Sequence, residues 1–315
     1  MVVFESYRRA VSSILLELGE RLEDLVVLDA DTGRSTGSLA FGKKFPGRYV
    51  NVGISEQDLI GTAAGLALAG LRPVAMGFAM FLMRAFEQIR NTLARDRLNV
   101  KVIATHAGLS PHIDGASHQS LEDLALMRSI PGMTVVSPAD FNSTRALVRA
   151  AVEDHVGPLY MRLGRDNAVH VYDNEDGFRI GGLRVVRDPV DIVIYAVGPM
   201  VGMSLEAARI LETRGIRAGV VDVYTVKPID SATITRLSTR TILSVTVEEH
   251  NTAGGLGGAV AEVLAEAGAG RLMRIGVHER FGTSSKTYLD LVESMGLTPR
   301  EIAAKIESAL ATVGR

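Results

Sequence analysis

The chain carries a strand-like run followed at once by a histidine-rich loop: Val100-Lys-Val-Ile-Ala-Thr105-His106-Ala-Gly-Leu-Ser-Pro-His112-Ile-Asp114-Gly-Ala-Ser-His118-Gln119. The run from Val100 to Thr105 is typical of a parallel strand covered on both faces. In open α/β sheets, ligands bind at the carboxyl ends of such strands. Three of the seven histidines lie in the loop, and histidine both binds metals and exchanges protons near neutral pH. The loop is therefore a candidate site.

Strand-like and helix-like segments alternate around this stretch. Further candidate strands are Leu25–Asp29, Tyr49–Val52, Val74–Gly77 and Thr134–Ser137. The candidate helices between them are Tyr7–Leu18, Gln57–Ala69, Met83–Ala94, Leu121–Ser129 and Asn142–Val152. This alternation predicts an α/β fold with a doubly wound, mostly parallel sheet.

The alternation weakens between Gly164 and Asp188, where turn-forming residues cluster at 173–177. It then resumes, with candidate strands at 191–197, 218–223, 241–247 and 273–276 and candidate helices at 203–214 and 259–267. We therefore expect a first domain over residues 1–170, a linker over 171–188 and a smaller α/β C-terminal domain over 189–315.

The composition argues against several classes of function. A formal net charge of −2 over 315 residues provides no electrostatic basis for binding nucleic acid or an anionic membrane. The absence of cysteine excludes disulfides, thiolate metal ligands and a cysteine nucleophile, and it fits a reducing compartment. The first residues lack the layout of a signal peptide. We expect a cytoplasmic protein.

The stretch from Leu59 to Met83 is almost wholly apolar. Arg72-Pro73 divides it into two runs, each too short to span a bilayer. The first run, from Gly61 to Gly70, consists of small and aliphatic residues. A helix that is apolar all round must be covered on every side. We interpret it as a helix packed in the core or against another subunit.

The residues alone leave the chemistry of the site open. His106, His112 and His118 are spaced by six, without the i, i+4 pair of a helical zinc site. A generic metal site, a hydrogen-bonded loop and a catalytic site all fit this spacing. Glu56, between a strand end and a helix, also suits the positive end of a helix dipole. Aromatic residues spaced like Phe78 and Phe81 are more often core residues than part of a cofactor pocket.

Several segments, in order and at matching spacing, resemble the C-terminal half of transketolase, a thiamine diphosphate enzyme. The segments are Gly53-Ile-Ser-Glu56-Gln57, Phe78-Ala-Met-Phe81 with Arg84-Ala-Phe-Glu-Gln-Ile-Arg90, His106 with Asp114-Gly-Ala-Ser-His118-Gln119, Leu121–Asp140, and Arg162-Leu-Gly-Arg165-Asp-Asn167. The resemblance extends from Tyr7 to Leu310.

The resemblance implies a cofactor site. Glu56 matches the glutamate that hydrogen-bonds N1′ of the cofactor's aminopyrimidine and promotes formation of the nucleophilic ylid. Phe78 and Phe81 match the aromatic residues that pack the pyrimidine ring. Asp31 matches an active-site position near the cofactor. Glu56, together with His106 and His118, forms the implied catalytic set.

The resemblance also implies a substrate site. His106, Asp114 and His118 match residues that contact the hydroxyl and carbonyl oxygens of the sugar. Ser35 matches a position near the substrate phosphate, and Arg165 matches an arginine that binds it. The implied reaction is transfer of a two-carbon ketol unit from a ketose phosphate to an aldose phosphate.

The family's Gly-Asp-Gly…Asn segment, which binds Mg²⁺ and the diphosphate, does not occur in this chain. The resemblance therefore implies a separate N-terminal transketolase subunit that holds the Mg²⁺, with no metal ligand in this chain. It also implies that this chain is inactive without that subunit. A heterotetramer with a second copy of each chain is the expected assembly.

Two residues depart from the family pattern. Phe4 stands where the family often has an arginine that helps to hold the substrate phosphate, so Arg8 or Arg9 compensates or the substrate differs. His112 has no clear family counterpart.

Three rival hypotheses remain. The β-subunit of a 2-oxoacid dehydrogenase E1 component has a similar length and a matching glutamate, but usually not the Asp-Gly-x-x-His-Gln run with an upstream histidine. Deoxyxylulose-phosphate synthase shares Asp114 and His118 but usually not His106. A regulatory or scaffolding subunit would have no need for the full set of matching residues.

Overall fold

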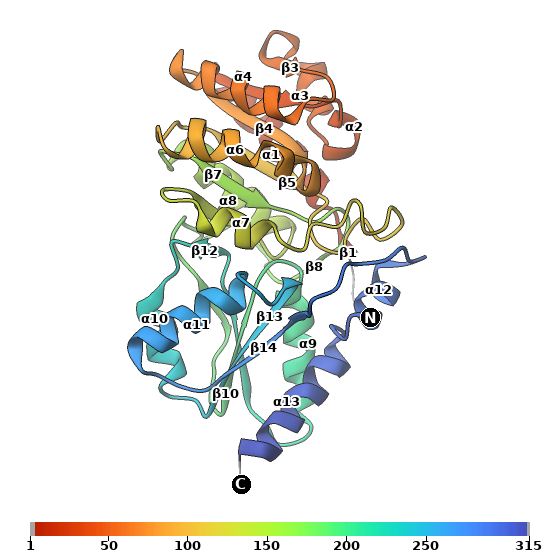
Figure 1. Cartoon of the computed structure of the whole chain (residues 1–315), viewed down its shortest axis with the longest axis vertical. Coiled ribbons are helices and arrows are strands. Elements are labelled where there is room, and N and C mark those ends of the chain that lie inside the picture. Colours follow the sequence, from red (N-terminus) through yellow and green to blue (C-terminus); the bar gives the residue numbers. More distant parts are fainter. Residues whose placement is uncertain (1–3, 314–315) are drawn as a thin grey trace.

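A seven-stranded sheet forms the centre of the first domain in the computed structural model, which describes residues 4–313 (Figure 1). The strand order is β12-β6-β7-β5-β4-β2-β3, and every pair is parallel except β12 with β6. The strands are β2 (Leu25–Asp29), β3 (Tyr49–Asn51), β4 (Arg72–Phe78), β5 (Lys101–Thr105), β6 (Thr134–Val136), β7 (Leu159–Arg162) and β12 (Thr225–Lys227).

Helices cover both faces of this sheet. They are α1 (Tyr7–Arg21), α2 (Gly33–Thr36), α3 (Leu39–Lys44), α4 (Glu56–Leu68), α5 (Ala79–Leu82), α6 (Phe86–Gln88), α7 (Asp123–Ser129) and α8 (Phe141–Glu153), with 3₁₀ turns at Pro46–Arg48 and Met83–Ala85 and a π-helical turn at Ile89–Ala94. Successive strand residues point to opposite faces. Thus Val27 packs in one core with Ile14 of α1, and Leu28 in another with Leu59 of α4.

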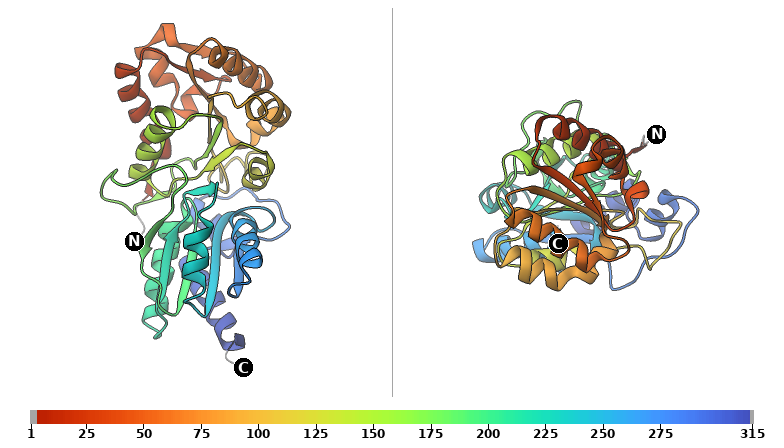
Figure 2. Two further views of the ribbon diagram at one scale, coloured as in Figure 1. Left: turned by 90° about the vertical axis from the view of Figure 1, so that its left-hand side faces the viewer. Right: turned by 90° about the horizontal axis from the view of Figure 1, so that it is seen from above.

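A second, five-stranded sheet forms the C-terminal domain, below the first in Figure 1 and in the left view of Figure 2. Its order is β14-β13-β10-β11-β9, parallel except for β9. The elements are β9 (Arg184–Arg187), β10 (Ile192–Ala196), α9 (Met200–Glu212), β11 (Ala218–Asp222), α10 (Ser231–Ser238), β13 (Leu243–Asn251), α11 (Leu256–Ala267), β14 (Leu272–Val277), α12 (Tyr288–Ser294) and α13 (Pro299–Val313). A short antiparallel pair joins β1 (Phe4–Glu5) to β8 (Ala168–Val169).

The structure confirms the α/β architecture but corrects its boundaries. The expected linker, 171–188, is not all linker, because β9 lies inside it. Val185 and Val186 of this short strand pack against different cores, so the strand belongs to the sheet. The strand β12 comes from the expected C-terminal domain but pairs with β6 of the first sheet. There Val226 is buried and the Lys227 ammonium donates to the carbonyls of Arg128 and Ile130.

The segment expected as one helix over 83–94 changes from 3₁₀ to α to π hydrogen bonding along its length. Over so few residues, hydrophobic spacing does not distinguish these helix types. Of the helices in the described part of the chain, none has the length and apolar character needed to cross a bilayer.

Candidate active site

Three adjacent parallel strands end beside one another at one edge of the first sheet. Phe78, the last residue of β4, lies opposite Thr105, the last residue of β5. Asp29 ends β2 on the other side of β4. The segments that follow these strands hold Asp31, Phe81 and His106. This topology explains why residues far apart in the sequence meet at the edge where open α/β sheets bind ligands.

Phe78, Phe81 and His106 form a stack of rings. The Phe78 ring lies nearly parallel to that of Phe81, with centroids 5.2 Å apart, and to that of His106, with centroids 3.8 Å apart. The rings of His118 and Phe81 meet edge to face, with centroids 5.1 Å apart. Both phenylalanines are half-buried, so part of this aromatic surface is accessible. The aromatic pair and the histidine loop therefore form a single site.

The backbone and its neighbours fix the His106 ring. His106 adopts φ of 57°, in the left-handed region that side-chain-bearing residues rarely occupy. The Thr105 hydroxyl lies 3.4 Å from the Gly77 carbonyl, to which it can donate, and 2.9 Å from Nδ1 of His106. Because a hydroxyl has one proton to donate, this arrangement favours an Nδ1–H that donates to Thr105. It leaves Nε2 as the accepting nitrogen.

Burial and, to a smaller extent, the nearby positive charges of Arg165 and Arg8 lower the pKa of His106 to about 3. In the unfolded chain the ring would titrate near its ordinary value, so protonation below that value opposes folding.

We expect His106 to stay neutral between about pH 5 and 8. Histidine-ring NMR of the chain should show no titration of His106 in this range. In contrast, Asp173 and Glu5 raise the pKa of His170, which serves as the control. A His106 titration midpoint near neutral pH would contradict the assignment.

Glu56 is the first residue of α4, where the positive end of the helix dipole favours a carboxylate. Its side chain is only 8% exposed. Yet none of the described residues gives this carboxylate a hydrogen bond or an ion pair. Buried carboxylates normally have partners. A carboxylate without a partner, on a residue that is otherwise largely buried, is suited to bind a polar group of a ligand.

Asp29 organises the loop that carries Asp31 and Ser35, a role that the sequence analysis missed. Its buried carboxylate accepts hydrogen bonds from the Thr32 amide (2.5 Å) and from the hydroxyls of Thr32, Thr36 and Ser38 (2.9–3.3 Å). Burial raises the pKa of Asp29 despite these bonds. The sequence offers a single signal for Asp29, which is that it ends a candidate strand two residues before Asp31.

Asp31 lies beyond this bond network, with φ of 63°. Its backbone N–H donates to the Asn51 side-chain oxygen, and the Asn51 amide nitrogen donates to the Asp31 carboxylate, both at 3.1 Å. Asn51 ends β3, so the loops after β2 and β3 support each other. Asp31 is thus exposed in a defined conformation.

A row of alternating charges joins the expected substrate residues Arg165 and Asp114. Arg8 makes a two-pronged ion pair with Asp166, which also accepts a hydrogen bond from the Ser6 hydroxyl at 2.5 Å. The Asp166 carboxylate lies 3.6 Å from the Arg165 guanidinium. In turn, the Arg165 guanidinium lies 4.0 Å from the Asp114 carboxylate.

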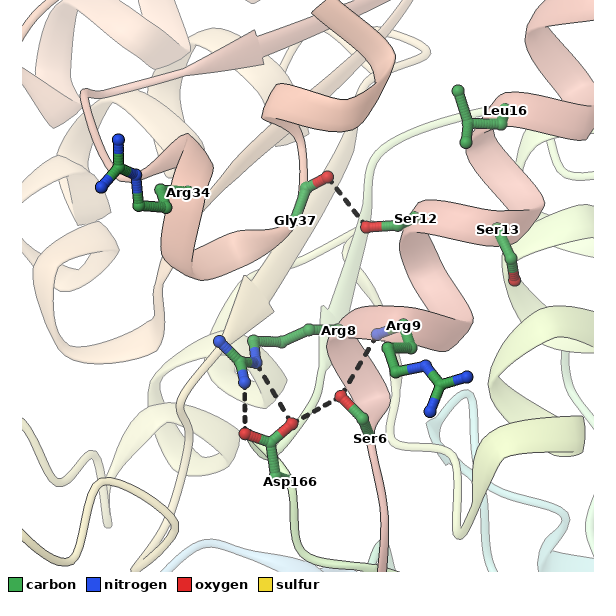
Figure 3. A pocket seen from close by; sticks show the side chains of 9 residues that line it. All are labelled: Ser6, Arg8, Arg9, Ser12, Ser13, Leu16, Arg34, Gly37 and Asp166. Atoms are coloured by element: carbon green, nitrogen blue, oxygen red, sulfur yellow. Dashed lines mark hydrogen bonds and ion pairs between the residues drawn. The ribbon is translucent and has the colours of Figure 1, made fainter. Parts of the chain in front are cut away.

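Ser35 joins the same group through Arg8, whose Nη1 donates to the Ser35 carbonyl at 3.5 Å. Figure 3 shows the Arg8 guanidinium turned toward Asp166 in a surface pocket. The pocket is lined by Ser6, Arg8, Arg9, Ser12, Ser13, Leu16, Arg34, Gly37 and Asp166. The sequence pattern gave no role to Asp166, although it follows Arg165 directly, and indicated Arg8 only as a substitute for the arginine absent at Phe4.

The loop histidines do not gather as metal ligands. Nδ1 of His112 lies 3.2 Å from the Ser110 carbonyl, and the His112 carbonyl accepts from the Ser285 amide at 2.7 Å. Within residues 4–313, three potential metal ligands come within 4.8 Å of one another only at Glu5, Asp140 and His170. There the Asp140 carboxylate already accepts the backbone amides of Ser143 and Tyr172.

The structure therefore brings together Phe78, Phe81, His106 and His118 in one ring cluster. Ser35, Asp114 and Arg165 are linked to one another by the charge row described above. Within the described part of the chain, no hydrogen bond or ion pair joins Glu56 or Asp31 to the other candidates. Asp31 follows β2 and Glu56 begins the helix after β3, and these two strands are parallel neighbours, so both residues lie at the same end of the sheet.

Comparison with known proteins first identifies the class of protein to which this chain belongs. Residues 5–169 match the model of the transketolase pyrimidine-binding domain, and residues 181–302 match that of the transketolase C-terminal domain. The sheet edge described above thus lies in a domain that, in thiamine diphosphate enzymes, binds the pyrimidine of the cofactor.

Individual relatives identify the family of the chain. A putative transketolase C-terminal section of Methanocaldococcus jannaschii is 44% identical over 96% of both chains. A 6-deoxy-6-sulfo-D-fructose transketolase subunit of a Clostridium species is 39% identical over 92% of this chain and 89% of its own. A solved structure described as a split gene transketolase, inactive beta4 tetramer, superposes with a TM-score of 0.90 at 45% identity, covering 99% of this chain and all of that one. The chain belongs to the transketolase family.

The 1-deoxy-D-xylulose-5-phosphate synthase of Gloeobacter violaceus is also similar, at 36% identity over 98% of this chain. This chain spans 48% of that synthase. Membership in the transketolase family implies dependence on thiamine diphosphate. The relatives matched over nearly their whole length include a C-terminal section and a split gene transketolase, which supports a role as part of a split enzyme.

Proposed function

We propose that this chain is the C-terminal subunit of a transketolase that transfers a two-carbon ketol unit from a ketose phosphate to an aldose phosphate. One observation carries the proposal. The partnerless carboxylate of Glu56 shares a sheet edge with an aromatic stack and a histidine loop, in a chain that matches a transketolase C-terminal section almost end to end.

The residues at this edge fit the aminopyrimidine of thiamine diphosphate. Glu56 offers a free carboxyl to ring atom N1′, and Phe78 and Phe81 offer accessible aromatic surface to a flat ring. Asp31 completes the cofactor side of the site. When bound, the cofactor supplies the nucleophilic carbon and the electron sink that cleavage of a C–C bond needs. Glu56 holds and releases the proton at N1′.

The histidine loop fits a sugar. Neutral His106 keeps Nε2 free to accept a hydrogen bond or a proton from a hydroxyl, and His118 and Asp114 add polar contacts from the same loop. Arg165 and Ser35 bind the anionic end of the substrate, as charge-assisted donors suit phosphate. Arg8, in contact with the Ser35 carbonyl and paired with Asp166, lies at this end of the site, where Phe4 provides no positive charge.

A second subunit is expected to complete the site. We assign the Mg²⁺ and the diphosphate to an N-terminal transketolase subunit, as the name of the Methanocaldococcus relative and the inactive tetramer support. An apolar surface around α4 fits such contacts, since Ile54 is 84% and Leu68 75% exposed. Gly61 and Gly65 on that helix have open space around them. We propose a cytoplasmic heterotetramer with two copies of each chain.

The test is to combine the chain with its N-terminal subunit, thiamine diphosphate and Mg²⁺, and to measure ketol transfer from xylulose 5-phosphate to ribose 5-phosphate. Parallel assays use 6-deoxy-6-sulfo-D-fructose as donor, pyruvate with glyceraldehyde 3-phosphate, and 2-oxoacids alone. Transfer from a ketose supports the proposal. Turnover of a 2-oxoacid without ketol transfer would instead favour a dehydrogenase or synthase and overturn it.

A further inference from the structure

The carboxylate of Glu249 reaches from the C-terminal domain into the histidine loop. Glu249 lies in β13 and is 1% exposed. Its Oε1 accepts the backbone N–H of Leu109 at 2.5 Å, three residues after His106, and its Oε2 accepts the Tyr288 hydroxyl of α12 at 3.2 Å. The same carboxylate therefore binds one group in each domain.

The loop is shaped to accept this carboxylate. Gly108 has φ of +63°, and a Cβ atom built on it would lie 2.8 Å from Cδ of Glu249. No L side chain fits there without displacing the carboxylate. Immediately before Gly108, the Ala107 amide donates to the Leu163 carbonyl at 3.0 Å, so the loop is held on both sides just after His106. The tethered Leu109 amide thus lies only three residues along the chain from His106.

Two further bonds dock the loop on the C-terminal domain. The Ser285 amide donates to the His112 carbonyl at 2.7 Å, and the Gln119 side chain donates to the Thr283 carbonyl at 3.0 Å. Figure 1 shows the loop, in yellow, beside the blue segment that carries these residues. Glu249 is the one charged side chain in this set of contacts, and it binds nearest to His106.

Charged and titratable groups face Glu249 from several elements. They are Arg162 of β7, Asp123 of α7, Tyr288 of α12 and Tyr7 of α1. Burial raises the pKa of Glu249 to about 7, although Arg162 and the Leu109 amide lower it. The carboxyl accepts the Leu109 N–H in either protonation state, because one oxygen stays an acceptor after protonation. A glutamine is therefore a fair mimic of its contact with the loop.

We propose that Glu249 is a positioning residue for catalysis: the C-terminal domain uses it to hold the histidine loop, so that His106 stays stacked on Phe78 and faces the substrate. This proposal rests on the proposed function for its catalytic consequence. Its structural part, the tether between Glu249 and Leu109, stands independently of that function.

The matched control is Glu248, the preceding residue of β13. It is equally buried, and its carboxylate also accepts backbone amides, those of Leu256 and Gly257 at 2.7 Å each, but at the start of α11. Burial raises its pKa to about 7 as well. The two residues thus share strand, charge, burial and bond type, and differ in which segment they hold.

Hydrogen exchange of the full chain tests the tether. In Glu249→Ala, exchange over residues 107–112 should rise by about 10–100-fold, the factor expected for loss of a charged hydrogen bond. The segment at 255–258 should be unchanged. Glu248→Ala should give the reverse pattern, and Glu249→Gln should restore protection of 107–112. Equal exchange over 107–112 in both alanine variants would overturn the tether.

Kinetics of the reconstituted enzyme test the consequence. Glu249→Ala should lower kcat/KM by about 10–100-fold and raise KM for the sugars, with Glu249→Gln near wild type. Affinity for thiamine diphosphate should change less than KM for the sugars, because the side chains of Glu56, Phe78 and Phe81 are themselves unaltered. If Glu249→Ala fails to fold, Gly108→Ala displaces the tether from the loop side and should reproduce the effect. Wild-type kinetics in a variant with increased loop exchange would overturn the positioning role. If the proposed function is wrong, the exchange pattern should still appear as predicted, but the wild-type enzyme should show no ketol transfer.

Discussion

Glu56→Ala is expected to lower ketol transfer by the reconstituted enzyme by about 10²–10⁴-fold, the range for loss of a positioned acid–base group. The folded chain should be little affected, since within its described residues the Glu56 carboxylate makes no hydrogen bond or ion pair. The loss should therefore appear in turnover and in thiamine diphosphate affinity, with an unchanged melting temperature. Steady-state kinetics, calorimetry and thermal unfolding measure the three quantities.

Asp58→Ala provides the control for this substitution. Asp58 lies in the same first turn of α4 but is exposed, where its carboxylate accepts from the Thr62 hydroxyl at 3.4 Å. Its loss removes a similar charge from the helix start and should leave turnover unchanged. Near wild-type turnover of Glu56→Ala would refute the role assigned to Glu56.

Asp123→Ala is expected to destabilise the chain by about 3–5 kcal/mol, the cost of leaving a buried charge without its partner. Asp123 is fully buried; its carboxylate accepts from Arg162 Nε at 3.0 Å and from the Tyr160 hydroxyl at 2.9 Å. The same guanidinium donates to the Glu249 carbonyl at 2.8 Å. Loss of Asp123 should therefore weaken the contact between the domains as well as the first domain. Urea unfolding of the full chain measures the change.

An exposed ion pair provides the comparison. Asp191 pairs with Arg217 through two short contacts at the surface. Asp191→Ala should cost about 0–1 kcal/mol, as surface pairs usually do. Equal losses for Asp123→Ala and Asp191→Ala would contradict the importance given to the buried pair.

The sequence predicted the fold where hydrophobic patterning is strong. Fully buried strands such as Lys101–Thr105 stand out as apolar runs, and their order with the helices specifies an α/β sheet. It did not predict β9 and β12, which have four and three residues and are stabilised by contacts distant in the sequence. Such short strands depend on their sheet partners more than on local preference.

The sequence also located the site but not its supports. The loop from His106 to His118 was identified from its histidines and its place after a strand. Glu56 and the two phenylalanines were identified because a resemblance gave each a role. Asp29 and Asp166 were missed, because a carboxylate that organises a loop or pairs with a guanidinium is recognised only from its bonds. The tether at Glu249 joins residues 140 positions apart, which no local pattern reveals.

The chemistry of the histidine loop became more definite with the structure. The spacing of the three histidines leaves a zinc site open. In the structure His106 stacks on Phe78, His118 approaches Phe81, and the His112 carbonyl binds the C-terminal domain. These positions fit the proposed recognition of a sugar beside an aromatic cofactor pocket.

The most direct test of the proposal that this chain supplies one half of a shared cofactor site is calorimetric titration of thiamine diphosphate with Mg²⁺. The titration is performed on this chain alone, on the N-terminal subunit alone and on their mixture. We predict saturable binding with full affinity only in the mixture, and weakened binding when the mixture contains Glu56→Ala. Binding of equal affinity to this chain alone, or no effect of Glu56→Ala in the mixture, would contradict it.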